Sequence, residues 1–306
     1  MLHGWIILDK PVGLGSTQAV SAVKRALREA GEPKTKVGHG GTLDPLASGV
    51  LPIALGEATK LAGRMLDATK EYAFTICFGE ETDTLDGEGE VVATSDARPT
   101  AADIAAVLAR FTGAIEQVPP AFSALKIGGR PAYQRSRDGE QLEMTPRTVT
   151  VHALGVVESK ADEVTLAATV SKGTYIRSLA RDIARAVGTV GHVSYLRRTR
   201  AGPFDLDQAI SLDFLNEAAK ARQLDGAVLP LTAALDDIPA LPVTPGQAQL
   251  LRHGQKLAGF PATGPHQSTT LMGPAPGLYL ATDDNRPVAL VEASAGGLRV
   301  VRGFNL

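Results

Sequence analysis

Residues 36–52 read KVGHGGTLDPLASGVLP. The four glycines in this stretch permit backbone conformations and close approaches that other residues hinder. Pro45 restricts the preceding residue to extended geometry, which would hold the carboxylate of Asp44 in a fixed direction. An isolated Asp-Pro pair is more often a surface turn, and a phosphate-binding loop does not fit because no Gly-Lys-Ser/Thr follows. A chemical role for Asp44 therefore needs support from the rest of the chain.

The elements on either side of this stretch mix strands and helices without regular βαβ repetition. The apolar residues 5–8 predict a buried strand, and residues 16–31 predict a helix with Ser16 or Thr17 as N-cap. Further predicted elements are strands over 72–78, 148–158 and 163–171 and helices over 100–113 and 175–188. This order favours an α+β fold, with a mixed, largely antiparallel sheet and flanking helices, over a doubly wound sheet.

The last part of the chain has a different composition. Prolines surround a short predicted helix with Thr244 as its N-cap, and a Gly/Pro-rich stretch follows over 258–277. Three short strand patterns then complete the chain, at 278–282, 287–292 and 298–302. We therefore predict a main domain over 1–240 and a small β-rich domain over 241–306 that docks on it.

The net charge of −2 conceals a segregation of charge along the sequence. Between residues 172 and 200 a single acid, Asp182, accompanies seven basic residues: Lys172, Arg177, Arg181, Arg185, Arg197, Arg198 and Arg200. Such a run predicts an electropositive face that could contact the phosphates of a nucleic acid. From charge alone, a solvated helix face explains the run equally well.

Other features of the sequence indicate the compartment in which the protein works. The N-terminus lacks the basic region, apolar core and cleavage site of a signal peptide, and no apolar stretch approaches the roughly 20 residues that span a bilayer. The single cysteine, Cys77, lies in a strand pattern and fits structural packing in a reducing compartment. We expect a cytoplasmic protein without a membrane partner.

The stretch 36–52 resembles the central motif of the TruB-type tRNA pseudouridine-55 synthases, Gly-His-x-Gly-x-Leu-Asp-Pro-x-Ala-x-Gly. Similar blocks follow in collinear order: WIILDKPVG (5–13), GEATK (56–60), KEY (70–72), TDTLD (82–86), PPAFSALK (119–126), SKGTYIR (171–177) and LRR (196–198). The basic, loop-like segment 119–147 looks like the family's insertion that grips RNA. Residues 250–254 look like the entrance to its C-terminal, PUA-like RNA-binding domain. Together the blocks are far more specific than one short motif.

The resemblance implies a pseudouridine synthase-like fold and isomerisation of the flipped-out uridine 55 in the T-loop of tRNA. It implies that Asp44 is the nucleophile, that Tyr72 stacks on the target base and that Arg177 pairs with Asp44. From the resemblance and the basic run we expect the substrate and the RNA to contact Lys10, His39, Asp86, Lys172, Tyr175, Leu196, Arg197 and Arg198. No protein partner is implied, and we expect a monomer.

The implied reaction explains these residue types. Pseudouridine formation breaks the C1′–N1 bond, turns the uracil and rejoins it through C5 without redox change, so we expect no cofactor and no metal. A carboxylate can either attack C1′ or remove a C2′ proton, and the sequence leaves both routes open. We expect Arg177 to hold Asp44 ionised through a bidentate pair. Flipping the nucleotide costs a few kcal/mol, which phosphate contacts from the basic run would offset.

Two other functions remain compatible with parts of this pattern. An RNA-folding module without chemistry would share the basic run but would not require Asp44 together with Arg177. A glycosidase or base-exchange enzyme would also act on a ribosyl bond. Such enzymes usually need a second carboxylate at a set separation, and none is evident in the stretch 36–52.

Overall fold

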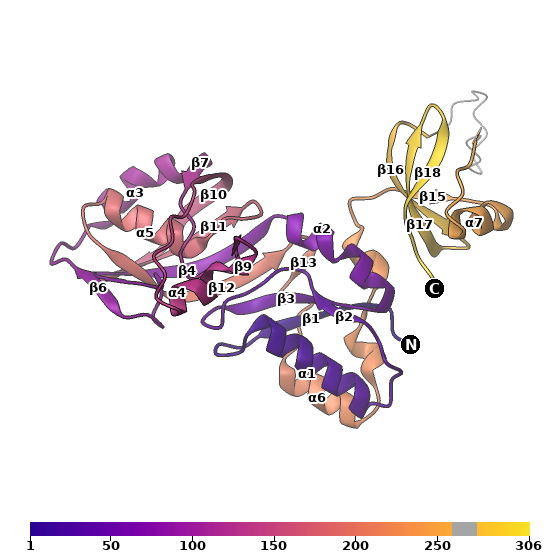
Figure 1. The fold of residues 1–306 in the computed structure, drawn as a ribbon, viewed down its shortest axis with the longest axis horizontal. Helices are drawn as coiled ribbons and strands as arrows, with labels where there is room; N and C mark the ends of the chain where they lie inside the picture. Colours follow the sequence, from indigo (N-terminus) through magenta and orange to yellow (C-terminus); the bar gives the residue numbers. More distant parts are fainter. Residues whose placement is uncertain (259–273) are drawn as a thin grey trace.

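The computed structural model describes residues 1–258 and 274–306, so most of the predicted Gly/Pro-rich stretch lies outside the described residues. A long sheet forms the main body (Figure 1). Its strands are β1 (Gly4–Lys10), β2 (Val37–His39), β3 (Ser48–Leu55), β4 (Lys70–Phe78), β7 (Gly113–Gln117), β10 (Arg147–Ser159), β11 (Glu163–Val170), β12 (Gly191–Ala201), β13 (Phe204–Asp205) and β14 (Leu229–Pro230). They follow the order β14-β1-β3-β12-β4-β11-β10-β7, with β2 beside β3 and β13 beside β12.

Every strand pair in this sheet is antiparallel except β3 with β12, where Arg197 lies opposite Ser48 and Arg198 opposite Gly49. The predicted mixed, largely antiparallel α+β sheet is thereby confirmed. The parallel strands are third and fourth of the eight in this order, and they join the part of the sheet with β1 to the part with β4. This junction carries residues directly downstream of Asp44.

Helices cover each half of the sheet. Helix α1 (Ser16–Glu29) packs against α6 (Leu212–Lys220) beside β1 and β3, whereas α3 (Ala101–Leu108) packs against α5 (Ile176–Ala186) at the other half (Figure 1). One apolar cluster, which includes Val23, Leu51, Phe74 and Leu179, runs through both halves. No helix within residues 1–258 and 274–306 is long and apolar enough to span a membrane.

The prediction that Ser16 or Thr17 is the N-cap of α1 is wrong. The N-cap is Gly15, whose backbone N–H donates to the side chain of Gln18 at 2.8 Å. Ser16 instead exchanges two hydrogen bonds of 2.8 Å with the backbone of Leu43, one as donor and one as acceptor. The start of α1 is therefore fastened to the residue before Asp44.

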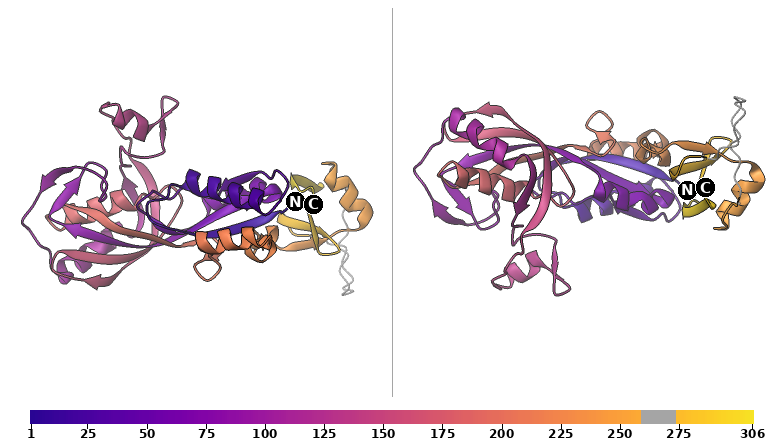
Figure 2. Two further views of the ribbon diagram at one scale, coloured as in Figure 1. Left: turned by 90° about the horizontal axis from the view of Figure 1, so that it is seen from below. Right: turned by 90° about the horizontal axis from the view of Figure 1, so that it is seen from above.

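The segment 119–147 is not only a loop. It holds a small hairpin, β8 (Lys126–Ile127) and β9 (Arg130–Pro131), followed by the short helix α4 (Ala132–Arg137). Figure 2 shows this segment projecting from the body on the side of α1. Helix α6, which contacts α1, lies on the side away from the insertion. The insertion and α1 thus border the same face of the molecule.

The C-terminal part forms a separate sheet of four strands, β15 (Ala240–Pro242), β16 (Gly277–Asp283), β17 (Arg286–Ser294) and β18 (Gly297–Gly303), with helix α7 (Pro245–Arg252). Its three last strands match the predicted ones, and Thr244 caps α7 as expected. Phe304, only 1% exposed, belongs to one buried cluster with Trp5 of β1. The backbone N–H of Asn305 donates to Glu57 at 2.8 Å, so the chain end is fixed to the main body.

Phe304→Ala should lower the free energy of unfolding by about 3 kcal/mol or more, because it removes a buried aromatic ring from the contact between the two parts. Urea denaturation of the full chain measures the change. Leu306→Ala serves as the control, since Leu306 is 56% exposed two residues away and should have little effect. Equal stabilities of both variants and the wild type would contradict a docking role for Phe304.

Candidate active site

Asp44 lies in the loop between β2 and β3, and a close approach of two backbones sets the position of this loop. Gly49 has φ +102°, and a Cβ atom there would lie 2.2 Å from the carbonyl oxygen of Arg198. Only glycine allows β3 to begin so close to β12. The side chain of Arg198 completes the junction by donating to the carbonyl oxygens of Val50 at 2.7 Å and of Gly41 at 3.3 Å.

The carboxylate of Asp44 forms an ion pair with Arg177, whose Nη2 lies 2.8 Å from Oδ2. The guanidinium is 5% exposed, and it also donates to the carbonyl oxygens of Thr84 at 2.7 Å and Phe122 at 2.9 Å. Its Nη1 lies 3.3 Å from the carboxylate of Asp86. The predicted bidentate pair is therefore wrong, because the two amino groups of Arg177 are divided among several oxygens.

The two carboxylates on Arg177 differ in their surroundings. Asp86 is 3% exposed and accepts further hydrogen bonds from the hydroxyl of Thr84 at 2.6 Å and the backbone N–H of Glu88 at 3.1 Å. The side chain of Asp44 is 37% exposed. Asp86 is thus buried among Arg177, Thr84 and Glu88, whereas the carboxylate of Asp44 is accessible to approaching molecules.

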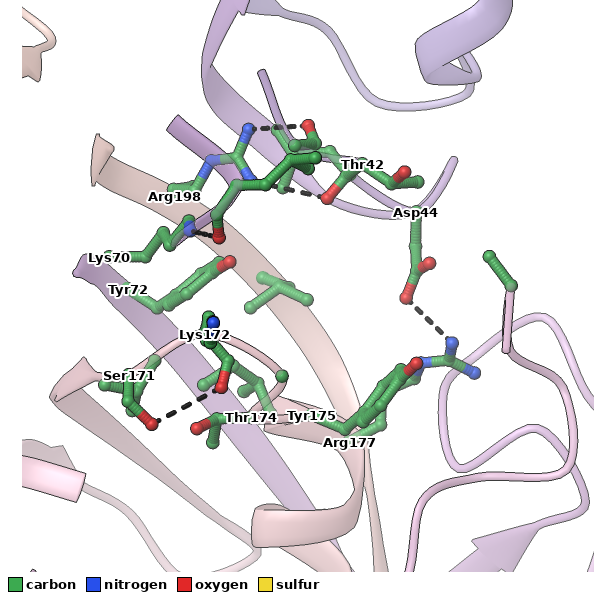
Figure 3. A pocket seen from close by; sticks show the side chains of 18 of the residues that line it. Thr42, Asp44, Lys70, Tyr72, Ser171, Lys172, Thr174, Tyr175, Arg177 and Arg198 are labelled. Atoms are coloured by element: carbon green, nitrogen blue, oxygen red, sulfur yellow. Dashed lines mark hydrogen bonds and ion pairs between the residues drawn. The ribbon is translucent and has the colours of Figure 1, made fainter. Parts of the chain in front are cut away.

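A cavity of about 320 Å³ opens beside Asp44 (Figure 3). It brings together seven of the residues singled out from the sequence: Asp44, Tyr72, Lys172, Tyr175, Arg177, Leu196 and Arg198. Figure 3 shows Tyr72 on the wall formed by β4, across the cavity from Asp44 and Arg177. The volume lies at the lower end of the range for ligand sites, which fits a single nucleotide base and its sugar.

A second cavity, of about 480 Å³, shares Asp44 and Arg177 with the first. The first residues of α1, the insertion and the predicted residues His39 and Asp86 line it. The Nδ1 atom of His39 is buried and has no hydrogen-bond partner among the described residues. Burial, together with the nearby Arg198, lowers the pKa of His39, so the ring is neutral near pH 7.

Lys10 lines neither cavity, although the resemblance implies a place near the substrate. Its ammonium is buried and donates to the carbonyl oxygens of Pro11 at 2.9 Å, Leu14 at 2.6 Å and Pro45 at 3.3 Å. Burial lowers the pKa of Lys10 to about 8, against an upward effect of Asp44. Lys10 therefore fixes the backbone next to Asp44 instead of facing a ligand.

Sequence reasoning missed Lys70, which lines the first cavity and is 7% exposed. Its ammonium donates to the carbonyl oxygens of Leu66 and Ala68, both at 2.6 Å. Burial, and secondarily the charge of Arg198, lower the pKa of Lys70 to about 8. The only signal in the sequence is its position two residues before Tyr72, in the block KEY.

The basic run does not form an uncompensated positive face. Its ion pairs join Lys172 to Asp67, Arg177 to Asp44 and Asp86, Arg181 to Asp182, Arg185 to Glu81, Arg197 to Asp9, and Arg200 to Glu71 and Asp205. Arg198 is 1% exposed and donates to three backbone carbonyls, so its charge lies beneath the surface of the junction. Most of the partner acids come from distant parts of the sequence, which a count along one segment cannot reveal.

The geometry agrees with comparisons against known proteins. Residues 24–176 match the model of the TruB family pseudouridylate synthase N-terminal domain. Residues 177–236 match that of the tRNA pseudouridylate synthase B C-terminal domain. The chain belongs to the TruB family of pseudouridylate synthases. It is accordingly a pseudouridine synthase, an isomerase, and both matched regions end before the four-stranded appendage.

Relatives named tRNA pseudouridine synthase B cover the whole length of this TruB-family chain. The protein of Novosphingobium aromaticivorans is 58% identical over 100% of this chain and 98% of its own. The protein of Zymomonas mobilis is also 58% identical, over 99% of this chain and 96% of its own. The Caulobacter vibrioides protein is 47% identical over 100% and 97%.

Solved structures of similar proteins have the same fold. A chain from an H/ACA RNP bound to a substrate RNA containing 2′-deoxyuridine superposes with a TM-score of 0.73 and 27% identity, covering 99% of this chain and 86% of that one. A chain of a Cbf5-Nop10-Gar1 complex superposes with a TM-score of 0.72 and 29% identity, covering 99% of this chain and 84% of that one. The predicted pseudouridine synthase-like fold is confirmed.

Lys10→Met should produce a stability difference from the wild type that depends on pH. Because the pKa of Lys10 is lowered from 10.5 to about 8, the folded protein holds this proton less firmly than the unfolded chain. The wild type should therefore gain stability relative to the variant as the pH rises from about 8 towards 10.5. Urea titrations of both proteins near pH 7 and pH 9.5 measure this difference, and a constant difference would contradict the lowered pKa.

Proposed function

We propose that this TruB-family protein isomerises uridine 55 in the T-loop of tRNA to pseudouridine, with Asp44 as the nucleophile. The names of relatives up to 58% identical over the whole chain support tRNA as the substrate. The observation that carries the proposal is the arrangement around Arg177. One partly exposed carboxylate, Asp44, is held by a buried guanidinium at the edge of a cavity whose far wall is Tyr72.

In this proposal Arg177 orients Asp44, because its buried guanidinium forms an ion pair with the carboxylate at 2.8 Å. When the C1′–N1 bond breaks, its electron pair passes to N1 of the uracil. Asp44 either bonds to C1′ or removes a proton from C2′, and the geometry is compatible with both routes. The base then turns, and C5 bonds to C1′ as the Asp44–C1′ bond breaks or, in the other route, as C2′ regains its proton. The proton on C5 is then lost and N1 takes up a proton.

Tyr72 offers a flat face against which the detached base can turn, and Leu196, 6% exposed, gives the cavity an apolar wall. His39 lies at the second cavity, where flipping of the nucleotide would place the RNA strand. The insertion over 119–147 would grip the strand from the opposite border of that cavity. The main domain over 1–240 would perform the chemistry, and 241–306 would serve as a PUA-like RNA-binding domain.

We further propose that the protein acts as a monomer in the cytoplasm without a protein partner. Asp44, Asp86, Arg177 and Tyr72 all come from one chain, so the site needs no residue from a second copy. The similar chain in the Cbf5-Nop10-Gar1 complex, in contrast, is part of an assembly with other proteins. Among the described residues of this chain, no group of three or more His, Cys, Asp or Glu side chains is arranged to hold a metal ion.

The test of this proposal is release of tritium from tRNA carrying uridine labelled at C5, followed by mapping of the modified position. Tritium release with modification at position 55 alone supports it. RNA binding without tritium release would favour an RNA-folding module. Release of free uracil would favour a glycosidase, for which Asp86 would be the second carboxylate, although its burial and its hydrogen bonds disfavour proton exchange with a sugar.

Asp44→Asn should lower the single-turnover rate by about 10⁴-fold while leaving tRNA affinity and folding nearly unchanged. An amide retains the shape of the carboxylate but neither attacks C1′ nor accepts the C2′ proton. The rate is measured by tritium release with enzyme in excess over tRNA. Asp213→Asn, at an exposed position in the first turn of α6, is the matched control. A folded Asp44 variant with near wild-type turnover would exclude Asp44 as the nucleophile.

Tyr72→Phe should keep the stacking face but lose the hydroxyl group near C5. We expect the single-turnover rate to fall by about 100-fold, as for loss of a group that moves a proton, with little change in tRNA affinity. Tritium release and a filter-binding titration separate the two quantities. Parallel losses of rate and affinity would instead assign Tyr72 to binding or packing.

A further inference from the structure

A groove away from the active site carries a cluster of unpaired positive charges. It has a volume of about 730 Å³ and lies between the second half of α1 and the loop that leads to β2. Four exposed basic residues line it, Lys24, Arg28, Lys34 and Lys36. In the part of the chain that the structure describes, none of their charged groups forms an ion pair or a side-chain hydrogen bond. The cations of the basic run at 172–200 are, in contrast, paired or buried.

The local structure does not account for this clustering. Lys24 and Arg28 are four residues apart on α1, a spacing at which like charges repel. The negative end of the helix dipole favours Arg28 in the last turn, but it does not reach Lys34 and Lys36 in the following loop. The one acid in the groove, Glu32, lies 3.9 Å from the N-terminal amine. A bound polyanion would relieve the repulsion among the four cations.

The groove is connected to the active site by two elements. Helix α1 has 14 residues and is therefore about 21 Å long. Its first residues line the second cavity next to Asp44, while its last turns line the groove. Strand β2 also leads from the groove, at Val37, to the cavity, at His39. Figure 2 shows α1 on the same side of the molecule as the insertion, so a strand of RNA that enters between them can extend along the helix.

We propose that the groove lined by Lys24, Arg28, Lys34 and Lys36 binds backbone phosphates of the RNA substrate, one helix length away from the flipped nucleotide. This inference rests on the proposed function in that the RNA is the enzyme's own substrate. Lysine and arginine bind phosphate oxygens by charge and do not read bases in this mode, so the groove contributes affinity and position without selecting the uridine.

The test compares binding of an unmodified tRNA transcript at several potassium chloride concentrations. The full chain carrying K24Q, R28Q and K34Q together should show a log–log salt slope that is smaller by about two units, because up to three phosphate contacts are lost. Its single-turnover rate at saturating tRNA should stay within about twofold of wild type, since no reacting atom is touched. The matched control is K160Q with K220Q, which removes exposed lysines that are paired with nearby glutamates.

Each outcome supports or contradicts phosphate binding in the groove. A reduced slope in the triple variant and an unchanged slope in the control support it. An unchanged slope in the triple variant overturns it. Weaker binding with an unchanged slope and a lowered melting temperature also overturns it, because the three residues would then act on folding. Failure of the wild type to release tritium would defeat the proposed function alone, because the slope comparison with the same RNA stays valid.

Discussion

The guanidinium of Arg177 is buried, and its N–H groups reach oxygens from separate parts of the chain. Asp44 comes from the loop before β3, Thr84 and Asp86 follow β5 (Glu80–Thr82), and Phe122 opens the insertion. Removing one partner from a buried charge network typically costs 3–5 kcal/mol, so these segments are held in place together. The position of the exposed carboxylate, the edge of the cavity and the root of the insertion all depend on this one side chain.

Other buried cations hold the remaining backbone around the cavities in the same way. Lys10 binds three carbonyls next to Asp44, Lys70 binds two before β4, and Arg198 binds three between residues 41 and 50. A loop rich in glycine has few side chains with which to fix itself. Ammonium and guanidinium groups supply several donors each, which satisfies carbonyls that have no partner in a strand or helix. The glycine-rich stretch is thus shaped by residues outside it.

The sequence predicted the elements with a clear period, such as β4, α5 and the last three strands, because their apolar spacing depends only on local burial. Asp44, Tyr72 and Arg177 at the first cavity were found through their motifs, whereas Lys70 was missed. The contacts of Ser16, Lys10 and Arg198 were not, because each depends on a backbone carbonyl or N–H brought from elsewhere by the fold. The prediction of a positive face from the basic run was wrong for the same reason, since Glu81 and Asp9 reach Arg185 and Arg197 only in the folded chain.

The distribution of charge explains how a protein with a net charge of −2 can present a positive surface to the proposed RNA substrate. Many of its acids are consumed in ion pairs with cations that frame the sheet and the cavities. An ion pair contributes little field beyond a Debye length of about 8 Å, so such pairs neither attract nor repel a distant phosphate. The field at a surface is then set by the charges without partners. In the groove beside α1 these are Lys24, Arg28, Lys34 and Lys36, and α1 lies on the side from which the insertion also projects. The net charge of the whole chain therefore does not determine the affinity of this face for RNA.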